Sequence, residues 1–352
     1  MIFMKKFPVR LISCGFMAIV LIGTAVSVSA DTLVVLNKSE ASASLIDLES
    51  GQEVARVATG QGPHEVAVSP DGSTAVVADY GTQGSPGKTL TVIDVPSASV
   101  VGTIRLGNYS RPHGIAYLAD GKRVAVTVEA QKALLLVDVP AGEIIGAVET
   151  GQDVSHMVAL SPDQKRAYVA NIGSGSMSAI DLEKGSLIAN VPTGEGAEGI
   201  TVTTDGRWVW VTNRGADTVS VIDAQSLEIV QTLPCASFPI RARATPDGQW
   251  VLVTNARSDQ LVVFNAETME EYQRIKMEIQ AEDSDGRLFG DFGESSVPIG
   301  VLVNPDSDLA YVAHANSDVI SVVDLDLMEI TGQLRGGKEP DGLGYSVQEV
   351  SD

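Results

Sequence analysis

The chain has 352 residues, of which 44% are apolar, 20% are charged and 5% are aromatic, and it contains 34 glycines and 2 cysteines. This composition excludes an intrinsically disordered protein, a small disulfide-rich domain and a polytopic membrane protein. The 24 Lys and Arg residues stand against 45 Asp and Glu residues, which gives a net charge of -21. So acidic a chain repels a phosphate backbone, and we expect no nucleic-acid partner.

Residues 1–30 have the three parts of a secretory signal peptide. Basic residues at the start are followed by an apolar run from Phe16 to about Val28 and by small residues up to Ala30. The apolar run is too short to span a bilayer well. We therefore expect cleavage after Ala30, a periplasmic or secreted location, and no membrane span in the mature chain. Cleavage leaves Cys235 as the single thiol, so we expect no internal disulfide.

Seven similar units fill residues 31–352. Each unit has a Val- and Ile-rich run that ends in an apolar residue followed by Asp or Asn, and successive pairs lie 47, 44, 43, 42, 42 and 59 residues apart. These pairs are Ile46-Asp47, Ile93-Asp94, Val137-Asp138, Ile180-Asp181, Ile222-Asp223, Phe264-Asn265 and Val323-Asp324. A turn of Ser-Pro-Asp-Gly type recurs between them, and four strand-length runs make up each unit. Self-similarity at such a period is typical of repeat architectures.

Four strands in each of seven units predict a seven-bladed β-propeller, an all-β fold with four antiparallel strands per blade. The last unit stops after its first strand, Pro340 to Ser346, whereas the mature N-terminus begins at a second strand, Leu33 to Asn37. The N-terminal and C-terminal strands therefore share the last blade and close the ring. We expect residues 31–352 to form this one domain.

Short motifs in the units point to a known family. The chain reads YVAN at residues 168–171, VTNRG at 211–215 and VTNAR at 253–257, together with SPDG at 69–72. These motifs resemble the YVTN-repeat β-propeller family, which includes YncE-like exported proteins, and the resemblance covers residues 31–347. It implies the propeller fold and no single activity, because propellers host binding modules and unrelated enzymes alike.

Two insertions interrupt the regular spacing of the units, at about residues 80–88 and at about residues 277–297. Both fall in connections on the side of the blades opposite the Ser-Pro-Asp-Gly turns, so both are expected at the same end of the central channel. Loops vary in length where a function is grafted onto a fold. We therefore predict that a protein or small-molecule ligand binds at this loop-bearing face.

Histidines gather at one position of the repeat. Alignment of the units on the Ser-Pro-Asp-Gly turn places these residues at the entry to the inner strand: His64, His113, His156, Glu198, Ile240, Ile299 and Asp341. The fourth histidine, His314, ends a second strand and is expected at the same rim. Imidazoles beside a carboxylate are ligands of zinc and copper, so His64, His113, His156, His314, Glu198 and Asp341 form a candidate transition-metal site. In the alternative interpretation, each histidine only hydrogen-bonds the backbone of a neighbouring blade.

Two arginines distinguish one inner strand from the others. Arg241 stands where other units have Glu, Gly or Met, and Arg243 stands where they mostly have Ala. In an acidic protein, this pair predicts a contact with a carboxylate or phosphate ligand. The same arginines could instead neutralise Glu198 and Asp341 as a structural ion pair.

Three classes of function stay open at this point. The first is a non-enzymatic binding or interaction module that acts through the loop-bearing face, with a zinc or copper site as a possible addition. The second is a hydrolase, because lactonase propellers share a similar repeat. The third is a cofactor-binding propeller of oxidoreductase type, because the heme-binding propellers of nitrite reductases look similar at the level of the blade. No catalytic motif or covalent heme motif occurs in the chain, and we favour the binding module.

Overall fold

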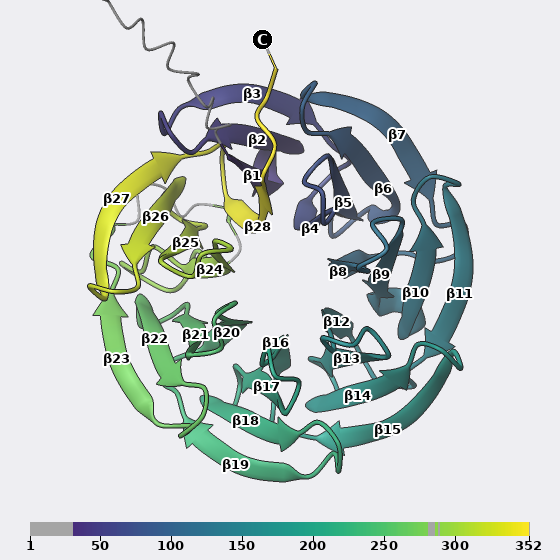
Figure 1. The fold of residues 1–352 in the computed structure, drawn as a ribbon, viewed down its shortest axis with the longest axis vertical. Coiled ribbons are helices and arrows are strands. Elements are labelled where there is room, and N and C mark those ends of the chain that lie inside the picture. The colour runs from purple at the N-terminus through teal and green to yellow at the C-terminus, as the bar shows by residue number, and fades with distance from the viewer. Residues whose placement is uncertain (1–30, 281–285, 288, 352) are drawn as a thin grey trace, which may run out of the picture.

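A computed structural model of the protein describes residues 31–280, 286, 287 and 289–351. Within these residues, the strands form seven four-stranded antiparallel sheets arranged in a ring around a channel (Figure 1). The predicted seven-bladed β-propeller is thus confirmed. The predicted signal peptide lies outside the described residues. In the part of the chain that is described, no helix is long and apolar enough to cross a membrane.

The seven blades follow one another in chain order, and the strands of each blade run in sequence from the channel outward. Blade 1 contains β28 (Pro340–Ser346), β1 (Thr32–Asn37), β2 (Ser42–Asp47) and β3 (Glu53–Ala58), with the 3-10 helix η1 (Lys38–Glu40) after β1. Blade 2 contains β4 (Pro63–Val68), β5 (Thr74–Gly81), β6 (Pro86–Asp94) and β7 (Ser99–Arg105). Blade 3 contains β8 (Pro112–Tyr117), β9 (Arg123–Val128), β10 (Ala133–Asp138) and β11 (Glu143–Glu149), with the 3-10 helix η2 (Glu129–Gln131) after β9.

The other four blades have the same layout. Blade 4 contains β12 (Ser155–Leu160), β13 (Arg166–Asn171), β14 (Ser176–Asp181) and β15 (Ser186–Pro192). Blade 5 contains β16 (Ala197–Val202), β17 (Trp208–Asn213), β18 (Thr218–Asp223) and β19 (Ile229–Pro234). Blade 6 contains β20 (Pro239–Ala244), β21 (Trp250–Asn255), β22 (Gln260–Asn265) and β23 (Glu271–Lys276). Blade 7 contains β24 (Pro298–Val303), β25 (Leu309–His314), β26 (Val319–Asp324) and β27 (Glu329–Arg335).

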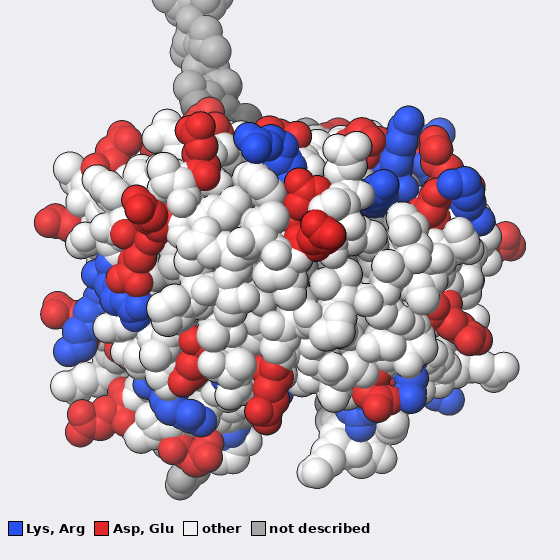
Figure 2. Space-filling view, turned by 90° about the horizontal axis from the view of Figure 1, so that it is seen from below, with Lys and Arg blue, Asp and Glu red and all other residues white. Residues whose placement is uncertain are grey.

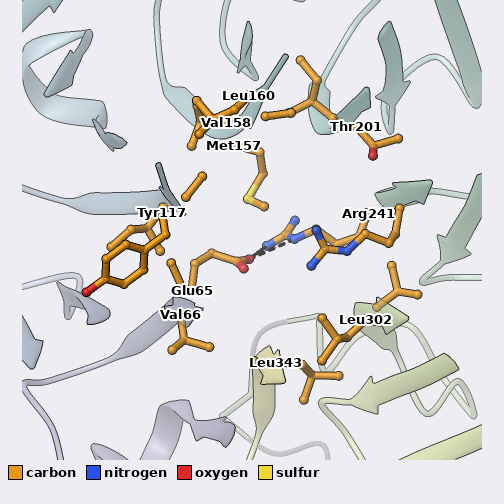
Figure 3. Close-up of a pocket in the computed structure, with 18 of the residues that line it drawn as sticks. Glu65, Val66, Tyr117, Met157, Val158, Leu160, Thr201, Arg241, Leu302 and Leu343 are labelled. Atoms are coloured by element: carbon orange, nitrogen blue, oxygen red, sulfur yellow. Dashed lines mark hydrogen bonds and ion pairs between the residues drawn. The ribbon is translucent and has the colours of Figure 1, made fainter. Parts of the chain in front are cut away.

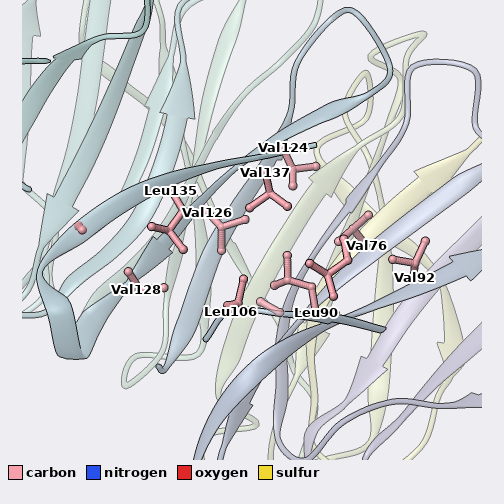
Figure 4. Packing of buried hydrophobic residues seen from close by; sticks show 12 residues of the cluster. Val76, Leu90, Val92, Leu106, Val124, Val126, Val128, Leu135 and Val137 are labelled. Atoms are coloured by element: carbon pink, nitrogen blue, oxygen red, sulfur yellow. The ribbon is translucent and has the colours of Figure 1, made fainter. Parts of the chain in front are cut away.

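The hydrophobic core lies between neighbouring blades. Alternate side chains of a strand point to opposite faces of its sheet, and each face here packs on the next blade. Val124 and Val126 of β9 face blade 2, whereas Ala125 between them faces blade 4. Figure 4 shows the first of these layers, where Val and Leu side chains of blades 2 and 3 interdigitate. Burial of both faces explains why the middle strands are continuous apolar runs rather than alternating ones.

The ring is closed by pairing between the two ends of the described chain. Strand β1 runs antiparallel to β28, with Thr32 opposite Ser346 and Val35 opposite Leu343. The predicted sharing of the closing blade is confirmed. Because the first and last strands hydrogen-bond directly, opening the ring requires a whole strand to be separated from its sheet.

The outer surface of the ring differs from its two ends. In the view of Figure 2, charged side chains gather toward the two edges, and the band between them is mostly uncharged. Several aliphatic side chains of the outer strands are exposed in the structure, among them Val101, Ile145 and Val230. On this side of the ring, both acidic and basic side chains therefore lie mainly near the channel ends.

One backbone device recurs at the start of all seven inner strands. The residue before each inner strand has a left-handed φ, between 56° and 73°, as in Arg111 and Gly196. Its carbonyl accepts a hydrogen bond of 3.0–3.2 Å from an amide at the end of the second strand of the same blade, or directly after it. The register in which the inner strand pairs with the second strand then shifts, directly after the first residue of the inner strand. Such a bulge re-aims side chains, and here it allows consecutive residues of the inner strand to face the channel.

The first predicted insertion lengthens a hairpin of blade 2. Strands β5 and β6 extend to Gly81 and Pro86, which pair with one another, and the extension carries Tyr80 to the channel rim. The second insertion, about 277–297, is described only in part. Its described residues Phe289 and Phe292 pack on Phe238, which directly precedes β20.

The close approach of neighbouring inner strands leads to a first testable prediction. A Cβ at Gly342 of β28 would lie 2.4 Å from the carbonyl oxygen of His64 in β4, a contact with backbone that has no room to move. We expect Gly342→Ala to lower the free energy of unfolding by about 1–3 kcal/mol. The control is Gly102→Ala in β7, where the nearest atom to the added carbon is 3.9 Å away. Urea unfolding measures both variants, and equal stability would contradict the inferred tight contact.

Candidate functional site

The inner column is the set of second residues of the seven inner strands, the position that the sequence alignment singled out. The structure brings its three histidines together at the channel end that carries the insertions. The ring centroids of His64 and His113 are 5.0 Å apart, and those of His113 and His156 are 3.5 Å apart. Glu198 and Asp341 flank them on blades 5 and 1. Ile240 and Ile299 close the column as buried apolar residues.

A second column, which we call the rim column, supplies the partners of the first. It consists of the seven residues whose amides donate the backbone hydrogen bond described above: Lys38, Tyr80, Glu129, Ile172, Arg214, Ala256 and Ala315. Six of them directly follow a second strand, and Tyr80 lies near the end of the extended β5. Sequence reasoning did not find these residues. The signal was present in the same alignment, since each follows the Asn, or its replacement, of motifs such as YVAN and VTNRG.

Tyr80 of the rim column connects the first two histidines to the third. Its ring lies 4.4 Å from the centroid of His64 and 5.5 Å from that of His113. Its hydroxyl donates a 2.6 Å hydrogen bond to Oε2 of Glu129. The other oxygen of Glu129 accepts a 2.6 Å hydrogen bond from Nδ1 of His156. The side chains of three successive blades are thus joined in one polar network.

The network favours the protonated form of His156. Its Nε2 lies 3.3 Å from Oε1 of Glu198, so the imidazole sits between two carboxylates. Burial alone would lower the pKa of His156, but the hydrogen bonds to Glu129 and Glu198 outweigh it and raise this pKa. Burial would also raise the pKa of Glu198, yet His156, Arg214 and Arg241 lower it to about 2.

His64 and His113 are kept neutral. Burial lowers the pKa of His64 to about 4, and nearby Lys38 adds to the effect. Burial, together with the positive charge of His156, lowers the pKa of His113 well below 6.5. His64 Nδ1 faces the carbonyl of Gly62 at 2.8 Å and donates to it in the neutral form. By contrast, Nδ1 of His113 is buried, and no group of the described residues hydrogen-bonds to it.

Some of these side chains approach the arrangement of a metal site. Ligand atoms of His113, Glu129 and His156 all lie within 4.8 Å of one another. Two of the four histidines predicted as ligands, His113 and His156, belong to this group, and Glu129 was not among the predicted residues. In the structure, Asp341 interacts with Lys38 at 3.4 Å instead.

The ion pairs of Arg241 cross the channel below the histidines. Its guanidinium donates to Glu65 of blade 2 at 2.9 and 3.1 Å and to Glu198 of blade 5 at 2.9 Å. Figure 3 shows the first of these contacts spanning the middle of the ring. Asp341 lies 4.0 Å from the same guanidinium. Arg241 therefore takes part in structural ion pairs, as the second of the two interpretations of the sequence expected.

Arg243, two residues along the same strand, is placed differently. It lies beyond the ion pair, faces a cavity of the channel and is exposed there. Within the described residues, no carboxylate forms an ion pair with it and no hydrogen bond of its side chain is found. The structure therefore separates the two arginines that the sequence analysis treated together.

His314 does not join the other histidines. It is fully buried, and its two ring nitrogens contact the hydroxyls of Ser296 and Ser321 at 2.7 and 2.8 Å. Equivalent asparagines in other blades make the same kind of contact, as between Asn37 and Ser44 at 2.9 Å and between Asn171 and Ser178 at 2.9 Å. His314 thus tethers its second strand to the third, which is a structural role.

The position of Arg241 leads to a second prediction. Arg241→Met would leave Glu65 buried without its cation, and breaking such a pair costs about 3–5 kcal/mol of stability. We expect urea unfolding to show a loss of this size. The double variant Glu65→Gln with Arg241→Met should recover part of it, because Glu198 keeps His156 and Arg214 as partners. No recovery in the double variant would show that Glu65 is not the group left uncompensated.

A third prediction concerns the pH dependence of stability. Burial lowers the pKa of His314 to about 3, so between pH 6.5 and 3 the unfolded chain binds a proton at this imidazole that the native state excludes. Stability therefore falls as the pH falls through this window. His314→Asn, which restores the residue of the sibling blades, should gain stability relative to the unmodified protein by about 1.4 kcal/mol for each pH unit of acidification. Urea midpoints at several pH values measure this difference, and a difference independent of pH would be inconsistent with a neutral buried His314.

Comparisons with known proteins find similarity to one family model and to a curated relative, each over part of the chain. A family model described as the Cytochrome D1 heme domain matches residues 119–245, which run from before β9 to the end of β20. Hydrazine synthase subunit beta of Kuenenia stuttgartiensis is 25% identical over 47% of this chain and 54% of its own length. The match therefore spans about half of that relative.

Solved structures share the fold at low sequence identity. The hydrazine synthase of Kuenenia stuttgartiensis matches with a TM-score of 0.66 at 18% identity, over 80% of this chain and 88% of that one. A functionally unknown protein from Desulfotomaculum acetoxidans matches with a TM-score of 0.73 at 15% identity, over 92% and 100%. Dihydro-heme d1 dehydrogenase NirN, solved in complex with DHE, matches with a TM-score of 0.60 at 18% identity, over 86% and 63%. The chain is thus a seven-bladed β-propeller whose central blades are similar to the Cytochrome D1 heme domain, and its YVTN-repeat assignment stays a prediction from the motifs.

Proposed function

We propose that this chain is a cofactor-binding propeller that holds a heme-type tetrapyrrole at the histidine end of its channel, without a covalent attachment. The observation that carries the proposal is His113, a neutral imidazole whose buried Nδ1 has no hydrogen-bond partner among the described residues. A neutral imidazole is the common proximal ligand of heme iron. Of the three classes predicted from the sequence, the comparisons favour the cofactor-binding one over the plain binding module and the hydrolase.

The residues around His113 fit the other needs of such a group. A macrocycle requires an aromatic or apolar surface, which Tyr80 provides beside His113. Phe238 and Phe292, which pack together at blade 6, provide a second aromatic surface. The carboxylates of the macrocycle require cations. Arg111 stacks over Tyr80 at 5.0 Å and Arg257 stacks over Phe292 at 4.5 Å, and neither is in an ion pair within the described part of the chain. The same residues would suit planar, anionic ligands in general.

The polar network behind His113 has a role of its own in this proposal. His156 carries a proton at Nε2 that faces Oε1 of Glu198, and Glu129 fixes its other nitrogen. Such second-shell hydrogen bonds hold a ring in one orientation. The charge of His156 also keeps its neighbour His113 unprotonated. When bound, a heme-type group would supply one-electron redox chemistry at its iron.

The family match is in keeping with this assignment. Residues 119–245 contain Glu129, His156, Glu198 and Arg214, which form most of the network. One of the similar structures is dihydro-heme d1 dehydrogenase NirN in complex with DHE, and this likeness also supports the proposal of a heme-type group.

A direct test adds hemin to the purified, mature protein and follows the Soret absorbance. We expect a saturable shift with about one equivalent of hemin, and at least a tenfold weaker affinity for His113→Ala, because removal of the ligand removes the iron–imidazole bond. His314→Asn is the matched control, since it removes a histidine that lies outside the site. If the combined alanine variant of His64, His113 and His156 binds hemin as well as the unmodified protein does, the proposal fails.

A second candidate is a transition-metal ion held directly by His113, Glu129 and His156. The specific observation in its favour is the approach of their ligand atoms to within 4.8 Å. Glu129→Gln separates the two candidates, because it removes a metal ligand and leaves His113 intact. Calorimetric titration with Zn²⁺ and elemental analysis would then show loss of metal in this variant, whereas hemin binding would persist. Retention of metal by Glu129→Gln would argue against this second candidate.

A further inference from the structure

The channel contains a second compartment, on the far side of the Arg241 ion pair from the histidines. A cavity of about 480 Å³ opens between the inner strands, and we call it the lower chamber. Its walls combine polar side chains, such as Gln164 and Thr201, with the aliphatic side chains of Val66, Ile115, Val158, Leu160, Ile200 and Leu302. Figure 3 shows several of these side chains around the Glu65–Arg241 pair. The lower chamber continues toward the Ser-Pro-Asp-Gly turns, where a second cavity shares Pro70, Arg243 and Tyr345 with it.

Small residues at the fifth position of the inner strands leave space for a ligand in the lower chamber. The fifth residue of the inner strand is Ala67, Ala116, Ala159, Thr201, Arg243, Leu302 or Gly344 in the seven blades. Five of these residues are small, so the ring is wide where Arg243 stands. Two residues nearer the histidine end, Glu65 and Arg241 meet across the channel. The lower chamber is therefore closed at one end by an ion pair and open at the other.

Arg243 is the unusual member of this ring. It is exposed to the channel, and among the described residues no carboxylate or other side chain bonds to it. The carboxylate of Glu65 attracts it electrostatically, but that carboxylate already accepts two hydrogen bonds from Arg241. A guanidinium stays charged throughout the physiological pH range. In a chain of net charge -21, Arg243 is thus an exposed cation of the channel without an ion-pair partner among the described residues, and it can pair with an anionic ligand.

From this juxtaposition we infer that the lower chamber binds a small amphipathic carboxylate, with its carboxylate on Arg243 and its aliphatic chain along the apolar wall. A planar guanidinium pairs with a carboxylate through two parallel hydrogen bonds. Apolar walls with one well-placed polar group are typical of small-molecule sites, and the volume lies in the usual range of about 300–1,000 Å³. A single unpaired arginine matches a monoanion better than it matches a multiply charged phosphate.

This site is separate from the proposed heme-type site. The Glu65–Arg241 pair lies between the lower chamber and the histidines, and Arg243 belongs to the chamber side. Occupation of the lower chamber therefore does not depend on His113 or on any cofactor, so each site can be tested without the other.

The test uses isothermal titration calorimetry on the mature, heme-free protein with octanoate as the ligand. We expect saturable binding of octanoate, and none of octylamine, which places a cation beside Arg243, while octanol should bind at least tenfold more weakly. Arg243→Gln should weaken octanoate binding at least tenfold. Arg105→Gln on the outer strand β7 is the matched control, because it removes an exposed arginine far from the channel, and it should leave binding unchanged.

Two further variants make the result decisive. Ala116→Phe fills the chamber from β8, and should abolish octanoate binding while the melting temperature shows that the protein stays folded. The combined alanine variant of His64, His113 and His156 should bind octanoate normally, so a failure of the heme proposal would leave this result intact. Absence of octanoate binding, or equal binding by Arg243→Gln and the unmodified protein, would overturn the inference.

Discussion

The interactions of Arg241 organise the whole channel. Its guanidinium reaches Glu65 on blade 2 and Glu198 on blade 5, so one side chain joins blades that are not neighbours in the ring. Each of these charges is buried, and each is tolerable only because the others are present. The pair also divides the channel, with the histidine network on one side and the lower chamber on the other. The two proposed sites are therefore separate because this ion pair lies between them.

The histidine network is formed by side chains on a backbone arrangement that all seven blades share. Every blade repeats the left-handed residue before its inner strand and the hydrogen bond from an amide at the end of its second strand, or directly after it. That bond holds the inner column and the rim column beside each other in all seven blades. In blades 6 and 7 both columns hold apolar residues, such as Ile240 and Ala256. In blades 2 to 5, the same positions hold the imidazoles and most of their partners.

Burial and charge explain the different states of three chemically identical side chains. His156 lies between two carboxylates, which raise its pKa, whereas burial lowers the pKa of His64 and of His113, neither of which has a carboxylate hydrogen bond. Burial therefore keeps these two imidazoles neutral, with a smaller contribution from nearby positive charge, and neutral imidazoles are the form that binds metals. The arrangement thus favours ligation by His113 over protonation of it.

The sequence by itself determined the fold, because four strand-length runs in each of seven units can bury both faces of their sheets only in a closed ring. It also determined the inner column, since equivalent positions in a repeat meet at one end of the channel. The tertiary structure alone decided which of these residues act together. Tyr80 and Glu129 became visible as partners only when neighbouring blades packed side by side, and His314 proved to be a buried tether between strands.

The two arginines illustrate the same division. Their place on one inner strand was evident from the sequence, yet their different surroundings were not. Arg241 meets carboxylates from blades 2 and 5, which lie far from it in the chain, whereas Arg243 stands where the other blades contribute mostly small residues. A repeat pattern specifies the position of a residue along the channel axis. The groups that this residue faces, however, belong to other blades across the ring. Contacts of that kind depend on the closure of all seven blades, which is a property of the folded chain.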